Sequence, residues 1–465
     1  MAELAPSEPP ILSLGSDFYT PVQAANFPKT ILRYRNDRAA GEVGLASLTD
    51  DQWVQRFGRF EPLPDNMPEP LALAYHGHQF RNYNPDIGDG RGFTFAQLRD
   101  ERGRLMDLGT KGSGQTPYSR TADGRLTLKG AVREVLATEM LEALGVPTSR
   151  TLSVIETGEE LERHDEPSPT RSAVLVRLSH SHVRFGSFQR LEYTGHRAAS
   201  ARLLDYVIAH FYPELDTGDA PGLLAAVSQR MAVMTARLMA AGFVHGVLNT
   251  DNMNINGENF DYGPWRFLPT LKPGAIAAYF DHGGLYAFGR QPEAIYWNLC
   301  ALADALRPLA DPKTLQAQLD RFPDYYAKAF ADAILRRLGV KGSGGKADQD
   351  FAQGFFTFLY DSQVPFERAF FDLFGGSAGA EKRERSPHAE LYRAAHAVTA
   401  LDALEPVRPE RLEHEAFMGE PETLLYKEVE GLWDELEPHD RWDAFEAKIS
   451  RIRRMGEAYD LAAAH

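Results

Sequence analysis

The chain has 465 residues, which is enough for two or three average domains or for one large two-lobed enzyme. Hydrophobic residues make up 43% and charged residues 25%, as in an ordinary soluble globular protein. The formal net charge of −15 argues against binding to nucleic acid or to an anionic membrane, because both require a basic surface. It does not exclude an anionic ligand in a locally basic cleft.

The N-terminal sequence MAELAPSEPP has no basic targeting segment, and no apolar run reaches the length of a membrane span. We therefore expect a cytoplasmic protein. Cys300 is the only cysteine, so an intramolecular disulfide is impossible. Its apolar surroundings in NLCALADAL predict a buried thiol that packs rather than reacts.

Strand patterns dominate the first half of the chain, and helical patterns begin at about residue 197. Two glycine-rich polar stretches, 341–350 and 375–388, are expected to be solvated loops. The sequence predicts a hairpin within 93–114 with its turn at residues 99–103, a helix over 128–144 and strands over 148–161 and 172–188.

The order of these elements is typical of an α+β fold of the two-lobed protein-kinase type. Its predicted parts are an N-terminal extension that packs on the core (1–70), a strand-rich nucleotide-binding lobe (71–195), and a helical lobe that carries the catalytic and metal-binding loop and ends in a helical extension (196–465).

A loop in the helix-rich part, HGVLNTDNMNINGENFDYG, has the letters of a phosphotransferase site. Asn252 and Asp261 offer the hard oxygen ligands that a divalent cation on nucleotide phosphates requires. Kinases place their catalytic aspartate five residues before the metal-binding asparagine. Here that position is Val247, so Asp251 becomes the candidate proton acceptor. The structural alternative is an Asx turn made by Asp251 and Asn252.

A second pair of charged residues lies upstream of this loop. Lys111 ends a β-like run, and Glu134 follows on the predicted helix. Kinases use a Lys–Glu ion pair of this kind to hold the lysine on the nucleotide phosphates. Glu139 on the same helix is a competing partner, and solvated surface charges are the structural alternative.

Alternating glycines precede the lysine, in DIGDGRG. Gly88 and Gly90 would let backbone amides approach phosphate oxygens, and Arg91 adds a cation. A hairpin turn explains the same glycines without a ligand. Arg177 and Arg184 flank SHSHV, and the forked guanidinium group suits phosphate, although isolated arginines are often surface cations.

Taken together, these segments resemble the selenoprotein O family, which are protein adenylyltransferases with a kinase-like fold; this chain looks like a bacterial type without selenocysteine. The resemblance spans residues 75 to about 306. Its most specific motifs are HGVLNTDNM followed by DYGP, and TPYSR. The other matching segments are YHGHQFRNYNPDIGDGRG, LGTKGSG, DGRLTLKGAVREVL, VRLSHSHVRFGSFQ and YAFGRQPEAIYWNLCALADAL.

The resemblance implies a reaction that accounts for Val247. Members of the family are described as binding ATP in a flipped orientation relative to kinases, so that AMP passes to a Ser, Thr or Tyr hydroxyl of a protein and pyrophosphate leaves. Asp251 would then be the proton acceptor, and Asn252 and Asp261 would bind Mg²⁺, with Mn²⁺ as the alternative ion. The implied nucleotide-binding residues are Gly88, Gly90, Arg91, Lys111 (oriented by Glu134), Asp123, Gly124, Arg177, Arg184 and Asp261.

The sequence departs from the family pattern in two places. The segment before YAF reads AAYFDHGGL instead of an Asn-His-Ser-Asp run with a nearby cysteine. The C-terminal AYDLAAAH lacks the cysteine or selenocysteine of relatives, so redox control through those thiols is not expected.

Four functions remain open from the sequence. Transfer of AMP from ATP to protein hydroxyls is the leading hypothesis, and UMP transfer from UTP with manganese is a close variant. The third is a conventional kinase that uses Asp251 as a displaced base, and the fourth is an inactive nucleotide-binding scaffold. Retention of Lys111, Glu134, Asn252 and Asp261 argues against the scaffold, because a scaffold needs no pair of metal ligands.

Overall fold

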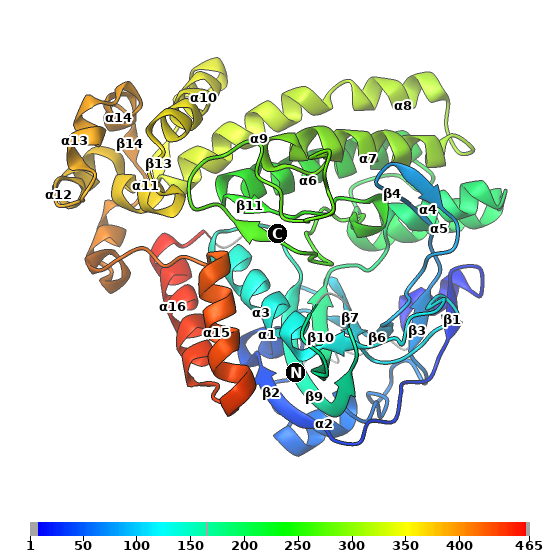
Figure 1. The fold of residues 1–465 in the computed structure, drawn as a ribbon. Helices are drawn as coiled ribbons and strands as arrows, with labels where there is room; N and C mark the ends of the chain where they lie inside the picture. The colour runs from blue at the N-terminus through cyan, green and yellow to red at the C-terminus, as the bar shows by residue number, and fades with distance from the viewer. Residues whose placement is uncertain (1–7, 164–165, 462–465) are drawn as a thin grey trace.

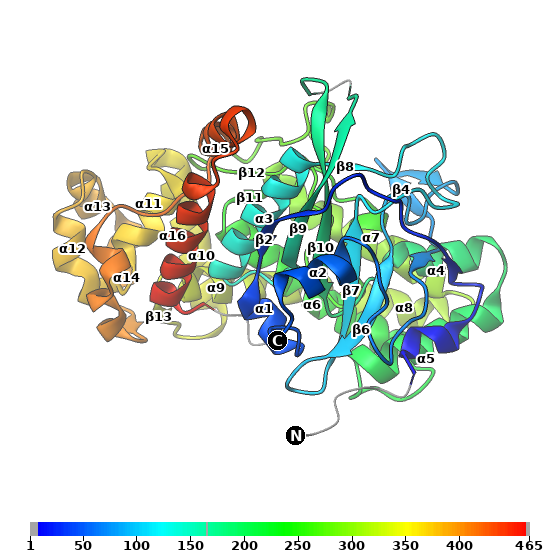
Figure 2. The same ribbon diagram turned by 90° about the horizontal axis from the view of Figure 1, so that it is seen from below.

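The computed structural model describes residues 8–163 and 166–461 (Figure 1). The chain is α+β, and a sheet from its first half lies beside a group of helices from its second half (Figures 1 and 2). The predicted order of a strand-rich part followed by a helix-rich part is therefore confirmed. Within the described ranges, none of the helices combines the length and the apolar character that crossing a membrane requires.

The sheet is antiparallel. The predicted hairpin is confirmed, because its two strands pair across a turn at residues 100–104. In spatial order the strands are β1 (Tyr19–Pro21), β3 (Leu71–Leu73), β6 (Thr94–Arg99), β7 (Leu105–Lys111), β10 (Thr170–Ser179), β9 (Arg150–Leu161) and β2 (Ile31–Arg35), with β8 (Leu126–Thr127) paired to β10.

Both edges of this sheet come from the first 70 residues. β1 pairs with β3 at one edge, and β2 pairs with β9 at the other. Residues 22–30 connect the two edges, so the N-terminal segment is integrated into the sheet. Two short helices, α1 (Asp37–Glu42) and α2 (Asp50–Phe57), follow β2.

Each face of the sheet packs against a hydrophobic core. Successive side chains of a strand point to opposite faces and therefore enter different cores. On β10, Ala173 and Leu175 join the core that contains α3 (Leu128–Ala143), the predicted helix. Val174 and Val176 join a second core with Trp53 of α2. A strand that is buried on both faces reads as a continuous apolar run, which is why its sequence was informative.

The helix-rich part is built around α6, which packs against α7, α8 and α9. Its helices are α4 (Phe185–Tyr193), α5 (Arg197–Phe211), α6 (Ala220–Ala240), α7 (Gln291–Leu306), α8 (Pro312–Leu319), α9 (Phe322–Arg337), α10 (Gly345–Ser362), α11 (Phe366–Leu373), α12 (Ala380–Glu384), α13 (Ala389–Ala394), α14 (His396–Asp402), α15 (Tyr426–His439) and α16 (Asp443–Tyr459).

The remaining elements are short. Two-stranded pairs are formed by β4 (Gly77–Gln79) with β5 (Asn82–Asn84), β11 (Phe243–Val244) with β12 (Arg266–Phe267), and β13 (Val340–Lys341) with β14 (Glu405–Pro406). The 3₁₀ helices are η1 (Pro10–Leu14), η2 (Thr250–Asn252), η3 (Phe288–Arg290), η4 (Gly376–Gly379), η5 (Pro409–Glu413) and η6 (Glu415–Met418).

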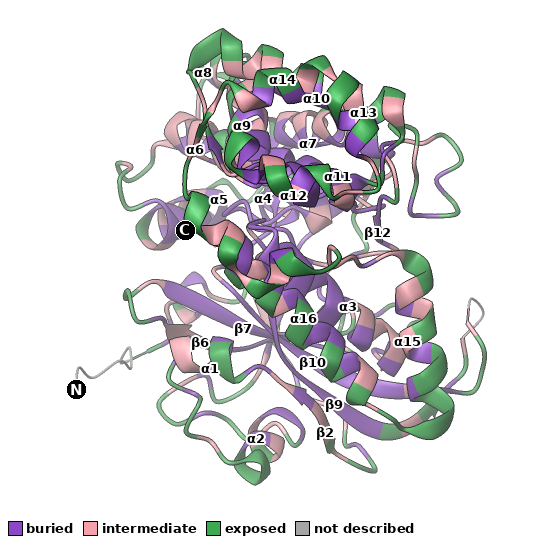
Figure 3. Cartoon of the chain, turned by 90° about the vertical axis from the view of Figure 1, so that its left-hand side faces the viewer, coloured by how far each residue is buried: buried purple, intermediate pink, exposed green. Residues whose placement is uncertain are grey.

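The last two helices return to the strand-rich part. α16 packs against α3, and Figure 1 shows α15 and α16 standing beside that helix. Figure 3 shows the inner face of α16 buried and its outer face exposed. Lys129 of α3 also forms an ion pair with Glu430 of α15 at 2.7 Å.

Two predicted loops are partly helical. The stretch 341–350 contains the start of α10. The Asp348 carboxylate in the first turn accepts the backbone N–H groups of Ser343 and Gly344 at 2.8 and 3.0 Å, which ties the residues just before the helix to it. The stretch 375–388 contains η4 and α12, which an ion pair between Arg383 and Asp402 at 2.7 Å holds in place.

Two further sequence predictions need correction. The strand predicted over 172–188 ends at Ser179, whose hydroxyl donates to Glu258 at 2.6 Å, and a helix begins at Phe185. Cys300 is partly exposed rather than fully buried, because it lies at the margin of the apolar face of α7 beside Tyr296. Partial burial still raises the pKa of its thiol.

The close contact between Gly186 and the backbone of His76 gives a test of the packing. A Cβ at Gly186 would lie 2.0 Å from the His76 carbonyl oxygen. Gly186→Ala should therefore lower the free energy of unfolding by about 1–3 kcal/mol, as in other overpacked interiors. Gly354→Ala on α10 is the matched control, since its Cβ would meet nothing within 4 Å. It should raise stability by up to about 1 kcal/mol through helix propensity. Urea denaturation that gave both variants the same stability would contradict this packing.

Candidate active site

A cavity of about 430 Å³ lies between the sheet and the helix-rich part. One wall consists of residues 87–94 with the ends of β7 and β10. The other wall is formed by Val247, Asp251, Asn252 and residues 261–263. The sequence-predicted residues that line it are Gly88, Gly90, Arg91, Lys111, Arg177, Arg184, Asp251, Asn252 and Asp261.

Two of the predicted nucleotide-binding residues do not line this cavity. The Asp123 carboxylate is bound to the Arg163 guanidinium at 2.8 Å, and Gly124 packs on the backbone of Gly114 with a φ of +71°. Their neighbour Ala122 does line the cavity, so both lie at its margin. Their role in nucleotide binding stays a prediction.

The sheet register places two cations side by side. Lys111 ends β7, and Arg177 on β10 is directly opposite Gly109 of the same strand. Because residues two apart share a face of a strand, Lys111 and Arg177 project from the same face. Lys111 Nζ lies 2.6 Å from a Glu134 carboxylate oxygen on α3, so the structure pairs it with the partner that the spacing favours. Glu139 is engaged elsewhere.

Asp261 is the centre of the charge network. Its Oδ1 contacts Arg177 and lies 3.6 Å from Lys111 Nζ, and its Oδ2 accepts from Arg184 Nη1 at 2.7 Å. Burial alone would raise its pKa, but these three cations hold the pKa of Asp261 well below its usual range. The residue therefore stays ionised. Its φ of +54° is uncommon outside glycine, and such strain persists only where surrounding contacts enforce it.

The candidate base is held by the β4–β5 hairpin, which lies over η2. The backbone N–H of His78 donates to the Thr250 hydroxyl at 2.7 Å, and Gln79 Nε2 donates to Asp251 Oδ2 at 3.3 Å. The other oxygen of Asp251, Oδ1, is buried without a hydrogen-bond partner in the described chain. Burial raises the pKa of Asp251 to about 6. A carboxylate with a free oxygen and such a pKa is suited to accept a proton.

Asn252 and Asp261 have the donor chemistry that a magnesium ion requires. The Asn252 amide nitrogen donates to the Val247 carbonyl at 3.0 Å, which leaves its amide oxygen available as a ligand. Both side chains line the same cavity. Magnesium binds through one or two such protein oxygens, with phosphates and water completing its shell. The contacts with Val247 and Gln79 also differ from those of an Asx turn, the structural alternative.

The glycine-rich segment packs against TPYSR. A Cβ at Gly88 would meet the Tyr118 ring at 2.5 Å, and one at Gly90 would meet the Tyr118 carbonyl oxygen at 3.1 Å. The Ser119 hydroxyl donates to the Gly90 carbonyl. These glycines therefore allow the close approach of TPYSR, which fixes the shape of this wall of the cavity.

Three further residues that line the cavity were not found from the sequence: Gln79, Asp89 and His182. Asp89 accepts from Arg184 Nη2 at 3.0 Å, and His182 Nε2 accepts from Arg177 Nε at 3.0 Å. Burial lowers the pKa of His182, which keeps its ring neutral and able to accept. Asp89 and His182 lie in sequence segments that were noted above, but no local pattern indicates which arginine each of them would bind.

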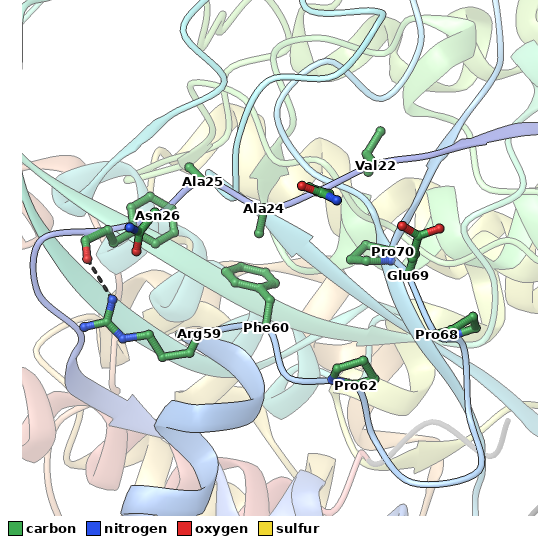
Figure 4. Close-up of a pocket in the computed structure, with 13 residues that line it drawn as sticks. Val22, Ala24, Ala25, Asn26, Arg59, Phe60, Pro62, Pro68, Glu69 and Pro70 are labelled. Carbon is green, nitrogen blue, oxygen red and sulfur yellow. Dashed lines mark hydrogen bonds between the residues drawn. The ribbon is translucent and has the colours of Figure 1, made fainter.

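A second cavity, of about 360 Å³, is lined by residues 22–27 and 58–70 (Figure 4). Its lining consists mostly of prolines, alanines and aromatic rings, with one carboxylate, Glu69, and one guanidinium, Arg59. Arg59 Nη1 donates a hydrogen bond to the Phe27 carbonyl oxygen at 2.8 Å. The chemistry of base, cations and metal ligands is in the first cavity, which is therefore the candidate active site.

Comparison with known proteins gives the class of this enzyme. The chain is 42% identical to the protein nucleotidyltransferase YdiU of Trichodesmium erythraeum, over 96% of this chain and 98% of the relative. It is 43% identical to YdiU of Gloeobacter violaceus over 96% and 95%, and 50% identical to YdiU of a Synechocystis strain over 73% and 72%. The protein is thus an enzyme, a protein nucleotidyltransferase, which has a nucleotide substrate and protein targets.

The family model "Protein adenylyltransferase SelO" matches residues 4–453. The chain belongs to the SelO family. The resemblance noted from the motifs around the metal-binding loop is thereby confirmed over nearly the whole sequence.

The contact between Gln79 and Asp251 can be tested by Gln79→Leu, which removes the amide donor and keeps a similar volume. We expect the rate of nucleotidyl transfer at saturating nucleotide to fall about tenfold, less than the 10²–10⁴-fold typical of losing a general base. Nucleotide affinity should not change. Asn82→Ala, at an exposed position of the same hairpin, is the control. Loss of nucleotide affinity in Gln79→Leu would instead assign Gln79 to nucleotide binding.

Proposed function

We propose that the protein transfers AMP from ATP to Ser, Thr or Tyr hydroxyls of other proteins, with release of pyrophosphate. One observation carries this proposal. The kinase base position holds an apolar residue, Val247, while the same cavity contains a carboxylate, Asp251, one oxygen of which has no hydrogen-bond partner in the described chain. A kinase reaction at the usual position would lack its proton acceptor, whereas a reaction displaced toward Asp251 would have one.

A protein-kinase-like arrangement supports the proposal. An ion pair joins a sheet lysine, Lys111, to a carboxylate on α3, as the Lys–Glu pair of kinases does. The candidate metal ligands lie across the cavity, on the loop that follows β11. The sheet precedes the helices along the chain (Figure 1), and residues of both parts line the cavity.

Each group of residues has its own role in the proposed reaction. The acceptor hydroxyl oxygen forms a bond to the α-phosphorus, the bond from that phosphorus to the bridging oxygen breaks, and pyrophosphate leaves. The Asp251 carboxylate takes the hydroxyl proton. Lys111, Arg177 and Arg184 bind the β- and γ-phosphates and stabilise the charge that develops on the leaving group. Magnesium held by Asn252 and Asp261, with manganese as the alternative, would neutralise phosphate charge when bound.

The decisive test is which phosphorus moves. With α-labelled ATP, protein should become labelled and gain the mass of an AMP group, because the α-phosphorus faces the acceptor. With γ-labelled ATP, protein should stay unlabelled. Autoradiography and intact mass spectrometry measure both results.

Each other outcome supports a different function. Label from the γ position alone would establish a kinase. Transfer from α-labelled UTP with manganese, and none from ATP, would establish a uridylyltransferase. ATP binding with no transfer of label from ATP at either position, and none from UTP with manganese, would support a scaffold.

The roles of the two aspartates are separable. Asp261→Ala removes the anionic metal ligand and should abolish both activity and binding of ATP with magnesium. Asp251→Ala should preserve that binding while turnover falls about 10²–10⁴-fold, as for other general bases. Titration calorimetry with ATP and magnesium measures the difference. If Asp251→Ala loses nucleotide binding as fully as Asp261→Ala, the assignment of Asp251 as the base is wrong.

A further inference from the structure

Glu139, the competitor for Lys111, has a different set of partners. Its carboxylate is 2% exposed and binds the Arg453 guanidinium through two hydrogen bonds, at 2.7 and 2.8 Å. It also accepts from the Tyr34 hydroxyl at 2.6 Å and from Asn36 at 3.2 Å. Burial alone would raise its pKa, but Arg453 and Tyr34 hold the pKa of Glu139 below its usual value. Arg38 of α1 is a second cation, 3.7 Å from the same carboxylate. Four elements therefore meet at one buried anion: α3, β2, α1 and α16.

The two carboxylates lie on different sides of α3. Glu134 and Glu139 are five residues apart, which corresponds to roughly 140° around a helix and about 7.5 Å along it. Glu134 points to Lys111 in the active site, and Glu139 points to α16 and β2. An ion pair on each side thus fixes the rotation of α3 about its axis and its distance from the sheet and from α16.

α16 is itself anchored to the helix-rich part. The Tyr459 hydroxyl donates to Glu367 at 3.3 Å, and Glu367 forms a buried ion pair with Arg337 of α9 at 2.6 Å. Gly456 lies against α3, where a Cβ would approach that of Ala143 to 3.0 Å. A glycine at this crossing lets the two helices approach closely, so α16 transmits the position of the helix-rich part to α3.

Loss of Arg453 would leave Glu139 as a buried carboxylate without its main counter-charge. Such a group is costly, and the protein lowers the cost by letting water reach it. A shift of α3 away from β2 and α16 would admit that water. The same shift would move Glu134 relative to Lys111, because both carboxylates belong to one rigid helix.

We infer that α16 is a brace that holds α3 where Glu134 pairs with Lys111, and that Arg453 is a positioning residue of the nucleotide site. The inference rests on the proposed function in one respect: Lys111 must bind the phosphates of ATP. Arg453 itself does not line the active-site cavity, and it acts through Glu139 and α3.

The experiment is titration calorimetry of the full chain with ATP and magnesium. Arg453→Met removes the charge and keeps the apolar stem, and we expect it to weaken ATP binding about tenfold, within the range usual for coupled sites. Arg454→Met is the matched control, since the neighbouring Arg454 guanidinium is exposed and forms a surface ion pair with Glu415 at 3.2 Å. The control should bind ATP as the unaltered chain does. Arg453→Lys, which keeps the charge but loses the fork, should restore part of the affinity.

A double-mutant cycle separates positioning from general destabilisation. In a Glu134→Gln background, Arg453→Met should weaken ATP binding by less than about twofold, because the contact that the brace positions is already lost. Tyr34→Phe removes one hydrogen bond from Glu139 and keeps the ring. It should act in the same direction as Arg453→Met, and it provides the test if that variant does not fold.

Two results would overturn the inference alone: unchanged ATP affinity in Arg453→Met, or an equal loss with and without Glu134. Failure of the unaltered chain to bind ATP would instead overturn the proposed function, and the inference with it. Label from γ-labelled ATP alone, together with the expected result in the double-mutant cycle, would overturn AMP transfer and support the role of α16.

Discussion

The contact of the Asp261 carboxylate with three cations joins the two parts of the molecule. Asp261 belongs to a loop of the helix-rich part, whereas Lys111 and Arg177 belong to central strands of the sheet. A buried carboxylate is tolerated only where cations surround it, and the cations in turn repel one another unless a carboxylate lies between them. The relative position of sheet and helices is thus set by the same charges that would bind a nucleotide, so structure and site cannot be altered independently.

This network continues through the molecule by way of α3. Lys111 is fixed by Glu134, α3 is fixed by Glu139, and Glu139 is fixed by Arg453 of α16. Two short ion pairs, one on each side of α3, make up this series, and the second joins segments 314 residues apart. Phosphoryl-type transfer depends on positioning and charge neutralisation more than on covalent chemistry. A series of rigid supports behind one lysine is consistent with that demand.

The sequence was most informative where local chemistry decides the structure. The helix at 128–144 has clear periodicity, and the central hairpin consists of two β-like runs around a polar turn. The Lys111–Glu134 pairing followed from element type and spacing. Contacts between distant segments were not accessible. Gln79 reaches Asp251 across 172 residues, and no local pattern encodes that approach. The start of α10 was missed because the stretch is rich in glycine and reads as a loop, and no local pattern shows that Asp348 would bind the backbone N–H group of Gly344.

The pairing of β2 with β9 has a consequence for synthesis of the chain. Ile31 of β2 pairs with Glu156 of β9, so β2 leaves the ribosome long before its partner exists. At the usual pace of translation the delay is on the order of ten seconds. An unpaired strand in that interval is a template for aggregation. β2 is only five residues long and contains Arg33 and Arg35, and short length and charge are the features that discourage wrong pairing at a strand edge.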